Sequence, residues 1–223
     1  MTIIDVNIES NAYSKGTLTQ NLINKMKKII VLFCTVCLIS VQFIAQHKTA
    51  AQFQLNMNRQ YSDETESPLT ETDRKKFKGL PFFTIDTQYT VVAKLKRIED
   101  SKPFEMKTTT ARRPEYVVYA IVTFKIRDKE HQLNLYKSYG SSMPDYEDYL
   151  FLPFTDETSG DRSYGGGRFI DLRIPDGEEI IIDFNQAYNP YCAYNHEYSC
   201  PIPPKENHVA TRIEAGVKYE SKE

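Results

Sequence analysis

The sequence has no excess of charge of either sign. Its 28 lysines and arginines nearly balance its 30 aspartates and glutamates, which gives a formal net charge of −2. Proteins that bind nucleic acid or anionic lipid carry a basic stripe or cluster that contacts the phosphates. No such stripe is present, so the sequence predicts no nucleic-acid partner and no electrostatic attraction to a membrane.

Motifs of nucleotide binding and of covalent catalysis are also missing. The chain has no G-x-x-x-x-G-K-[ST] or G-x-G-x-x-G run, no G-x-S-x-G elbow, and no cysteine-protease signature around any cysteine. The run from Gly165 to Arg168 has two interpretations: an anion site built from backbone N–H groups and a guanidinium, or a turn in which two backbones approach closely. No catalytic residue and no cofactor can be assigned from motifs.

Long apolar runs are scarce, and the one that stands out is near the N-terminus. Met26-Lys27-Lys28 is followed by an apolar run over residues 29–44, which is shorter than a membrane-spanning helix requires. We therefore predict a signal peptide over residues 26–46, with residues 1–25 as a non-native upstream extension. Residues 47–223 are then expected to form one exported domain, periplasmic or extracellular, that contacts the membrane only if the signal is not cleaved.

Only four cysteines are present, and two of them, Cys34 and Cys37, fall inside the apolar run. The other two, Cys192 and Cys200, would remain in an oxidising compartment, where a disulfide can persist. We predict a disulfide between them. Two buried thiols, or a metal site completed by His196, are the alternatives, although zinc sites usually have four ligands.

The pattern beyond residue 47 predicts helices first and strands afterwards. One helix is expected around Phe53, Met57 and Tyr61, which fall four apart, and a second begins at Thr70, where Asp73 can complete a capping box. Alternating or continuous apolar runs then predict strands over residues 88–96, 102–110, 116–126, 131–136 and 209–214.

A hairpin is predicted around Pro175-Asp176-Gly177, because this sequence favours a tight turn with a glycine bulge. The resulting register pairs Ile170 with Ile182 and places Asp171 and Asp183 on one face. In total we expect a mainly β fold of about seven strands, an antiparallel sandwich or a partly closed barrel, with one or two N-terminal helices and a long irregular C-terminal segment.

Several short motifs resemble one family of bacterial and archaeal proteins, the domain-of-unknown-function family numbered 1684. The motifs include Phe-Leu-Pro-Phe-Thr-Asp from Phe151, Asp-Phe-Asn-Gln-Ala-Tyr-Asn-Pro from Asp183, and Ile-Glu-Ala-Gly from Ile213. The likeness covers about residues 67–218. It implies no activity, and the chain departs from the common Ala-Gly-Glu pattern by having Val217.

Polar and aromatic residues concentrate between residues 151 and 216, and we predict the functional site there. Paired carboxylates beside an arginine can hold a ligand or a proton, and tyrosines can wall a pocket with hydroxyl tips; both sets can equally be structural. The ligand-binding candidates are Arg168, Asp171, Asp183, Asn185, Tyr164, Tyr188, Asn189 and Tyr194.

Three functions are compatible with this pattern. The leading hypothesis is a protein that binds a small polar or aromatic-compatible ligand in a pocket formed by the C-terminal segment. The alternatives are a hydrolase that uses Asp171 and Asp183 as a carboxylate pair, with or without a metal, and a structural envelope protein without a site.

Overall fold

The computed structural model describes residues 25–28, 49–140 and 147–219. The chain divides into two compact units, Met1–Ala45 and Gln46–Glu223. In the first unit, residues 25–28 form a helical turn. Residues 1–24 of the predicted extension and most of the predicted signal peptide lie outside the described residues. Within these three ranges, no helix is long and apolar enough to cross a bilayer.

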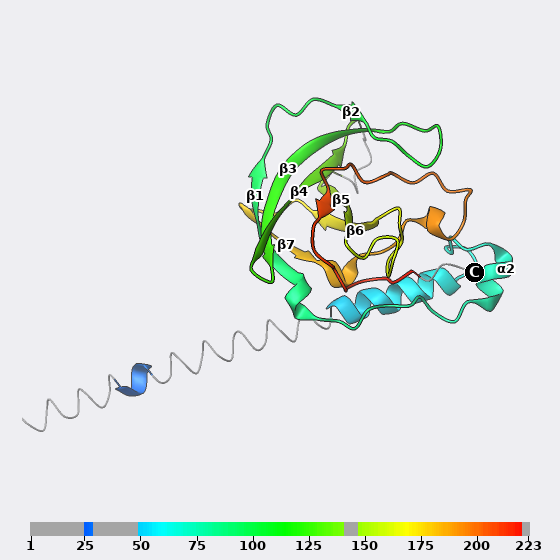
Figure 1. Cartoon of the computed structure of the whole chain (residues 1–223), viewed down its shortest axis with the longest axis horizontal. Helices are drawn as coiled ribbons and strands as arrows, with labels where there is room; N and C mark the ends of the chain where they lie inside the picture. The colour runs from blue at the N-terminus through cyan, green and yellow to red at the C-terminus, as the bar shows by residue number, and fades with distance from the viewer. Residues whose placement is uncertain (1–24, 29–48, 141–146, 220–223) are drawn as a thin grey trace, which may run out of the picture. The chain divides into compact units, whose positions relative to one another are not determined.

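One strongly curled sheet dominates the second unit (Figure 1). Its strands follow the order β6-β5-β4-β3-β1-β7, with β2 added to β3 and β8 to β5. All pairs are antiparallel except β5 with β8. The strands are β1 (Thr90–Arg97), β2 (Phe104–Glu105), β3 (Glu115–Ile126), β4 (Lys129–Ser138), β5 (Tyr149–Asp156), β6 (Arg168–Arg173), β7 (Glu179–Asp183) and β8 (His208–Val209). The predicted mainly β fold is confirmed as an open, half-barrel sheet.

The predicted β6–β7 hairpin is wrong. β6 pairs with β5, which sets Ile170 opposite Leu152, whereas β7 pairs with β1, which sets Ile182 opposite Val91. The two strands therefore occupy opposite edges of the sheet, and residues 174–178 cross the gap between them. The turn sequence is locally suited to a hairpin, but each strand gains more by pairing with a longer neighbour that shares its apolar face.

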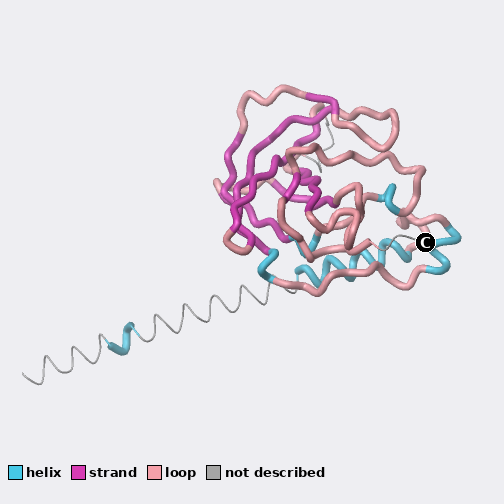
Figure 2. Tube along the Cα trace, viewed as in Figure 1, coloured by secondary structure: helices cyan, strands magenta, loops and turns pink. Residues whose placement is uncertain are grey.

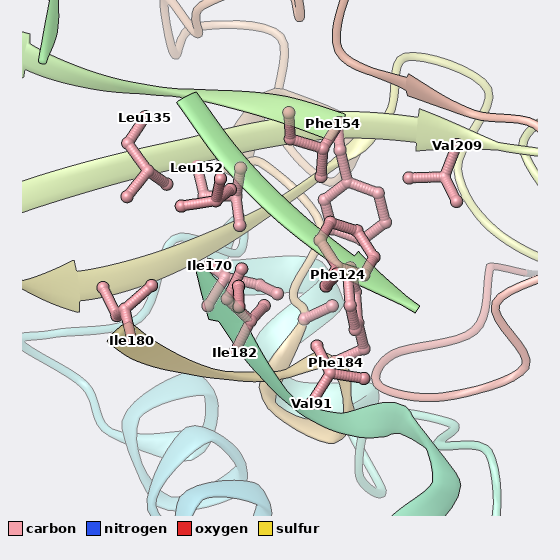
Figure 3. Close-up of a cluster of buried hydrophobic side chains, with 14 of the residues drawn as sticks. Val91, Phe124, Leu135, Leu152, Phe154, Ile170, Ile180, Ile182, Phe184 and Val209 are labelled. Carbon is pink, nitrogen blue, oxygen red and sulfur yellow. The ribbon is translucent and has the colours of Figure 1, made fainter. Parts of the chain in front are cut away.

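The main core fills the inside of the curl (Figure 3). Apolar side chains from both edge strands and from the middle of the sheet meet there; among those labelled are Val91, Phe124, Leu135, Leu152, Phe154, Ile170, Ile182 and Phe184. β8 and the residues after it close the same core with Val209, Ile213 and Ala215. Burial on this scale, at about 25 cal/mol per Å² of apolar surface, is the main force that holds the sheet curled.

A β-bulge in β3 changes which face its side chains take. Val118 pairs with Tyr136 but Ala120 pairs with Leu135, so Tyr119 is an extra residue between them. Because a bulge shifts the period-2 alternation by one, Ala120 points into the main core whereas Val118 joins a second cluster with Tyr136. The even-numbered residues of β3 thus face the second cluster before the bulge and the main core after it.

β5 was not predicted as a strand. Pro153 lies in its middle and cannot donate to a ladder. The side chain of Asn207 compensates for this gap. It donates to the carbonyls of Pro153 (2.8 Å) and Asn134 (2.9 Å), and accepts from the N–H of Asn134 (3.0 Å). Asn207 is fully buried, so a single amide joins β4 to β5 where the proline interrupts direct pairing.

Two helices precede the sheet, as predicted. The first covers residues 49–62 and buries Met57 and Tyr61 against Leu80 and Val217. The second, α2 (Glu71–Lys76), begins at the predicted cap, where Thr70 Oγ1 accepts from the N–H of Asp73 at 3.2 Å. These helices sit beside the C-terminal segment (Figure 1).

The C-terminal part of the chain is irregular, as Figure 2 shows by its long loops. It contains the short 3-10 turns η3 (Phe184–Gln186) and η4 (Tyr191–Ala193), and the predicted strand over 209–214 reduces to β8. Backbone hydrogen bonds nevertheless fix its end: the N–H of Val217 donates to Ala187 O, and the N–H of Phe83 donates to Gly216 O. The segment is part of the core, not an appendage.

Candidate functional site

The β5–β6 ladder has two buried faces. Leu150 and Leu152 point into the main core, so Tyr149 and Phe151, which alternate with them, point the opposite way. Asp171 pairs with Phe151 and therefore lies on that second face. The helix over 49–62 and the irregular C-terminal segment cover this face and enclose a space above it.

This space is a cavity of about 560 Å³. The sheet, the first helix, the β2–β3 connection and the C-terminal segment all contribute to its wall. The lining residues are Phe53, Met57, Gln60, Arg112, Tyr116, Tyr149, Phe151, Phe169, Asp171, Tyr188, Pro190, Tyr191, Cys200 and Pro201. Its volume is in the range of small-molecule sites, and aromatic residues make up half of its lining.

A carboxylate lies in the aromatic wall. Asp171 Oδ1 accepts hydrogen bonds from the hydroxyls of Tyr149 and Tyr188, both at 2.7 Å. Burial, with a further contribution from the negative charge of Asp171, raises the pKa of Tyr188 well above its usual value. Tyr188 therefore stays a donor at neutral pH, and the two hydroxyls fix the orientation of the carboxylate.

The predicted carboxylate pair is not formed. Asp171 is on β6 and Asp183 is on β7, at the other edge of the sheet. Asp183 is buried and accepts from Thr90 Oγ1 (3.0 Å), from the backbone and side chain of Asn185 (3.0 and 2.8 Å), and from Gln186 Nε2 (3.1 Å). Asp183 and Asn185 thus cap η3 and tie it to β1, and they share no partner with Asp171.

Arg168 is also enclosed by partners of its own. Its Nη2 contacts Asp156 Oδ2 at 2.7 Å and Ile213 O at 2.8 Å, its Nη1 donates to Ala215 O, and its side chain is completely buried. Burial lowers the pKa of this guanidinium, and the attraction of Asp156 opposes that effect. Because Arg168 points inward, it does not support the anion-site interpretation of Gly165–Arg168.

The glycine run is instead a close approach of backbones. A Cβ on Gly167, whose φ is +87°, would lie 2.6 Å from Phe154 O. The conformation and the space both require glycine at this position.

The remaining candidates do not line the cavity. Asn189 is fully buried and donates to Tyr194 Oη at 3.0 Å, and Tyr194 packs edge-on against Tyr61 at 5.3 Å between ring centroids. Tyr164 packs against Tyr219. Of the eight predicted ligand-binding residues, the structure brings Asp171 and Tyr188 together on the cavity.

The two cysteines are adjacent and are free thiols rather than the predicted disulfide. The N–H of Cys192 donates to Cys200 Sγ at 3.2 Å. A hydrogen bond from Cys200 lowers the pKa of Cys192 to about 7, while the same contact and burial raise the pKa of Cys200. The two thiols therefore titrate as a unit, and Cys200 lines the cavity. Among the described residues, no three His, Cys, Asp or Glu side chains are grouped so as to hold a metal ion.

Several cavity residues were not among the predicted ligand-binding residues. Phe53, Met57 and Gln60 come from the first helix. The spacing of its apolar residues predicts a buried face but does not predict which segment packs against it. Tyr116 faces the cavity because it precedes the bulge in β3, and Arg112 lies in a connection without any recognisable motif. Their proximity depends on contacts between distant segments, which the spacing of residues does not encode.

The chain resembles a solved structure of an uncharacterized protein. This is the solution NMR structure of an uncharacterized protein from Haloarcula marismortui, with 30% identity, a TM-score of 0.63, and coverage of 80% of this chain and 96% of that one. A search among curated proteins finds no match. The model of the family described as "Protein of unknown function (DUF1684)" matches residues 75–218, and the chain belongs to this family.

Proposed function

We propose that this protein binds a small molecule with a flat, apolar body in the cavity on the second face of β5 and β6. The supporting observation is the composition of the wall: seven of its fourteen residues are aromatic, and only Arg112 and Asp171 carry charge. Rings of this kind contribute a large contact area with few internal rotations to lose on binding. A core plug of aromatic side chains would fill this space instead of leaving about 560 Å³ open.

The walls of the cavity are held in place before any ligand arrives. The rings of Phe151 and Phe169 pack edge-on at 4.8 Å, and Phe169 packs edge-on against Tyr188 at 5.9 Å. Gln60 Nε2 donates to Tyr191 Oη at 3.0 Å, which joins the helix to the C-terminal segment. A preformed wall lowers the entropic cost of binding.

A thermal-shift screen of neutral aromatic fragments, followed by NMR titration of the hits, tests this proposal. We expect fragments that raise the unfolding temperature and shift the resonances of cavity residues. Phe53→Ala removes one ring from the wall and should weaken their binding at least tenfold. Leu55→Ala is the matched control, because Leu55 is on the same helix but 53% exposed and away from the cavity.

Two results would contradict the proposal: a screen without any fragment that shifts cavity resonances, or binding that Phe53→Ala leaves unchanged. The first would favour a purely structural role.

We also propose that the protein is exported, which rests on the sequence of residues 26–46. Expression of the full chain, cell fractionation and mass spectrometry of the recovered protein test this. We expect material outside the cytoplasm that begins near residue 47; an intact N-terminus in the cytoplasmic fraction would overturn it.

A further inference from the structure

The two charged groups on the cavity wall stand at separate places along it. Asp171 is the cross-strand partner of Phe151, and the ring of Phe151 lies 5.9 Å from that of Tyr116. Burial raises the pKa of Tyr116, and the positive charge of nearby Arg112 opposes that rise. On this wall Asp171 is therefore next to Phe151, Phe151 is next to Tyr116, and Arg112 is near Tyr116.

The tyrosine hydroxyls bind only one of the two carboxylate oxygens of Asp171. Both tyrosine hydroxyls bind Oδ1, and no donor among the described residues reaches Oδ2 of Asp171. The side chain is accessible to solvent and lines the cavity. An oriented carboxylate with a free oxygen, next to the faces and edges of aromatic rings, is suited to a cationic nitrogen, which both the charge and the rings attract.

The guanidinium is oriented in a similar way. Arg112 donates from Nε to Ser199 Oγ at 3.2 Å and from Nη2 to Ser199 O at 2.9 Å. Within the described part of the chain, its Nη1 has no acceptor. Ser199 therefore fixes the plane of the guanidinium and leaves one edge available for an anionic oxygen of a ligand.

We infer that the ligand is a zwitterion in which an ammonium group and an acidic group are separated by a flat apolar segment. The ammonium binds Asp171, the apolar segment lies on Phe151 and Tyr116, and the acidic group binds Arg112. This inference rests on the proposed function, since it assigns the chemistry of the same cavity. A ligand with one charge would leave the opposite charged residue without a counter-ion inside the cavity.

Three probes of nearly equal shape separate the two charges: 4-methylbenzylamine, 4-methylbenzoate, and neutral 4-methylbenzyl alcohol. Dissociation constants come from NMR titration of cavity resonances. We expect each charged probe to bind at least tenfold more tightly than the alcohol. Because each charged probe reports on one end, the result does not depend on the length of the natural ligand.

Single substitutions test which residue causes the tighter binding of each charged probe. Asp171→Asn keeps an acceptor for the two tyrosines but removes the charge, so we expect the amine to bind no better than the alcohol while the benzoate still binds tightly. Arg112→Gln should show the reverse selectivity. Asp176→Asn, at an exposed position in the 174–178 connection, is the matched control and should change neither constant.

The possible failures are distinguishable. If all three probes bind equally in the cavity and Asp171→Asn changes none of them, the zwitterion is excluded while the binding function stands. If no probe shifts cavity resonances, both proposals fail. A thermal unfolding curve of each variant confirms that the fold is retained, and a variant that unfolds is replaced by Asp171→Glu, for which we expect the preference for the amine to be weakened but not lost.

Discussion

Arg168 and Asp156 form an ion pair at 2.7 Å in which neither side chain is exposed to solvent. The pair lies between β5 and β6 at one side and the C-terminal segment at the other, where the carbonyls of Ile213 and Ala215 also accept from the guanidinium. A charge so enclosed is stable only while all its partners are present.

Removal of the acid from this pair should destabilise the protein strongly. We expect Asp156→Asn to lower the free energy of unfolding by about 3–5 kcal/mol, because it leaves a buried guanidinium without a counter-charge. Asp161→Asn breaks the exposed ion pair with Arg212 and should cost far less, because solvent screens this pair. Urea unfolding measures both; equal losses in the two variants would contradict the assignment.

Replacement of Asn207 should destabilise the protein nearly as much as replacement of Asp156. Asn207→Ala leaves the N–H and carbonyl of Asn134 and the carbonyl of Pro153 without their partner, which we expect to cost about 2–4 kcal/mol. Asn56→Ala, on the exposed side of the first helix, removes one hydrogen bond to Gln52 and should change stability by less than about 0.5 kcal/mol. A small effect of Asn207→Ala in chemical denaturation would show that β4 and β5 do not depend on this amide.

Tyr61 should make the protein sensitive to alkali. Burial raises its pKa above the ordinary value of 10.0, so above pH ~10 the unfolded chain releases a proton that the folded chain retains. Stability is then fully present below that pH and falls as pH rises, by up to about 1.4 kcal/mol per pH unit for this group.

Tyr61→Phe tests this directly. The hydroxyl has no hydrogen-bond partner among the described residues, so its removal should stabilise the protein by about 1 kcal/mol at pH 7 and should reduce the alkaline slope by about one proton. Urea unfolding between pH 7 and 11 gives both values. An unchanged slope, or a loss of stability at pH 7, would show that the hydroxyl is bound or hydrated.

Oxidation should join the two cysteines. Glutathione disulfide would accept the two hydrogens of Cys192 and Cys200 and would be reduced to two glutathione molecules, so the peptide that holds the pair becomes lighter by about 2 Da and the bond adds roughly 2–3 kcal/mol. Mass spectrometry with and without reductant, together with thermal unfolding, checks this. Cys192→Ser is the control, and an unchanged mass in the wild-type protein would exclude the disulfide.

Local features of the fold were predictable from the sequence. The cap at Thr70, the buried face of the first helix and the continuous apolar strand β3 depend on neighbours within a few residues, and the structure confirms them. The sequence around Pro175 also favours a tight turn locally. The error lay in the partners of β6 and β7, which are set by strands far away in the sequence.

The site was harder to predict for the same reason. Arg168 and Asp183 look like ligand-binding groups in a linear sequence, and only the three-dimensional structure shows that each is enclosed by its own partners. Conversely, Tyr116 reads as a core residue of a continuous apolar strand until the bulge at Tyr119 is known. Asp171 was selected as one half of a carboxylate pair with Asp183; that pair is not formed, but the structure places Asp171 on the cavity wall.

The C-terminal carbonyls that bind Arg168 also set the order of events when the chain is made. Residues up to Arg173 are synthesised before Ile213 and Ala215, so a nascent chain cannot enclose this charge until residues 213–215 have left the ribosome. A chain that stops at β7 therefore lacks two of the acceptors that this buried guanidinium uses. Ile213 and Ala215 complete the set of acceptors that encloses the charge.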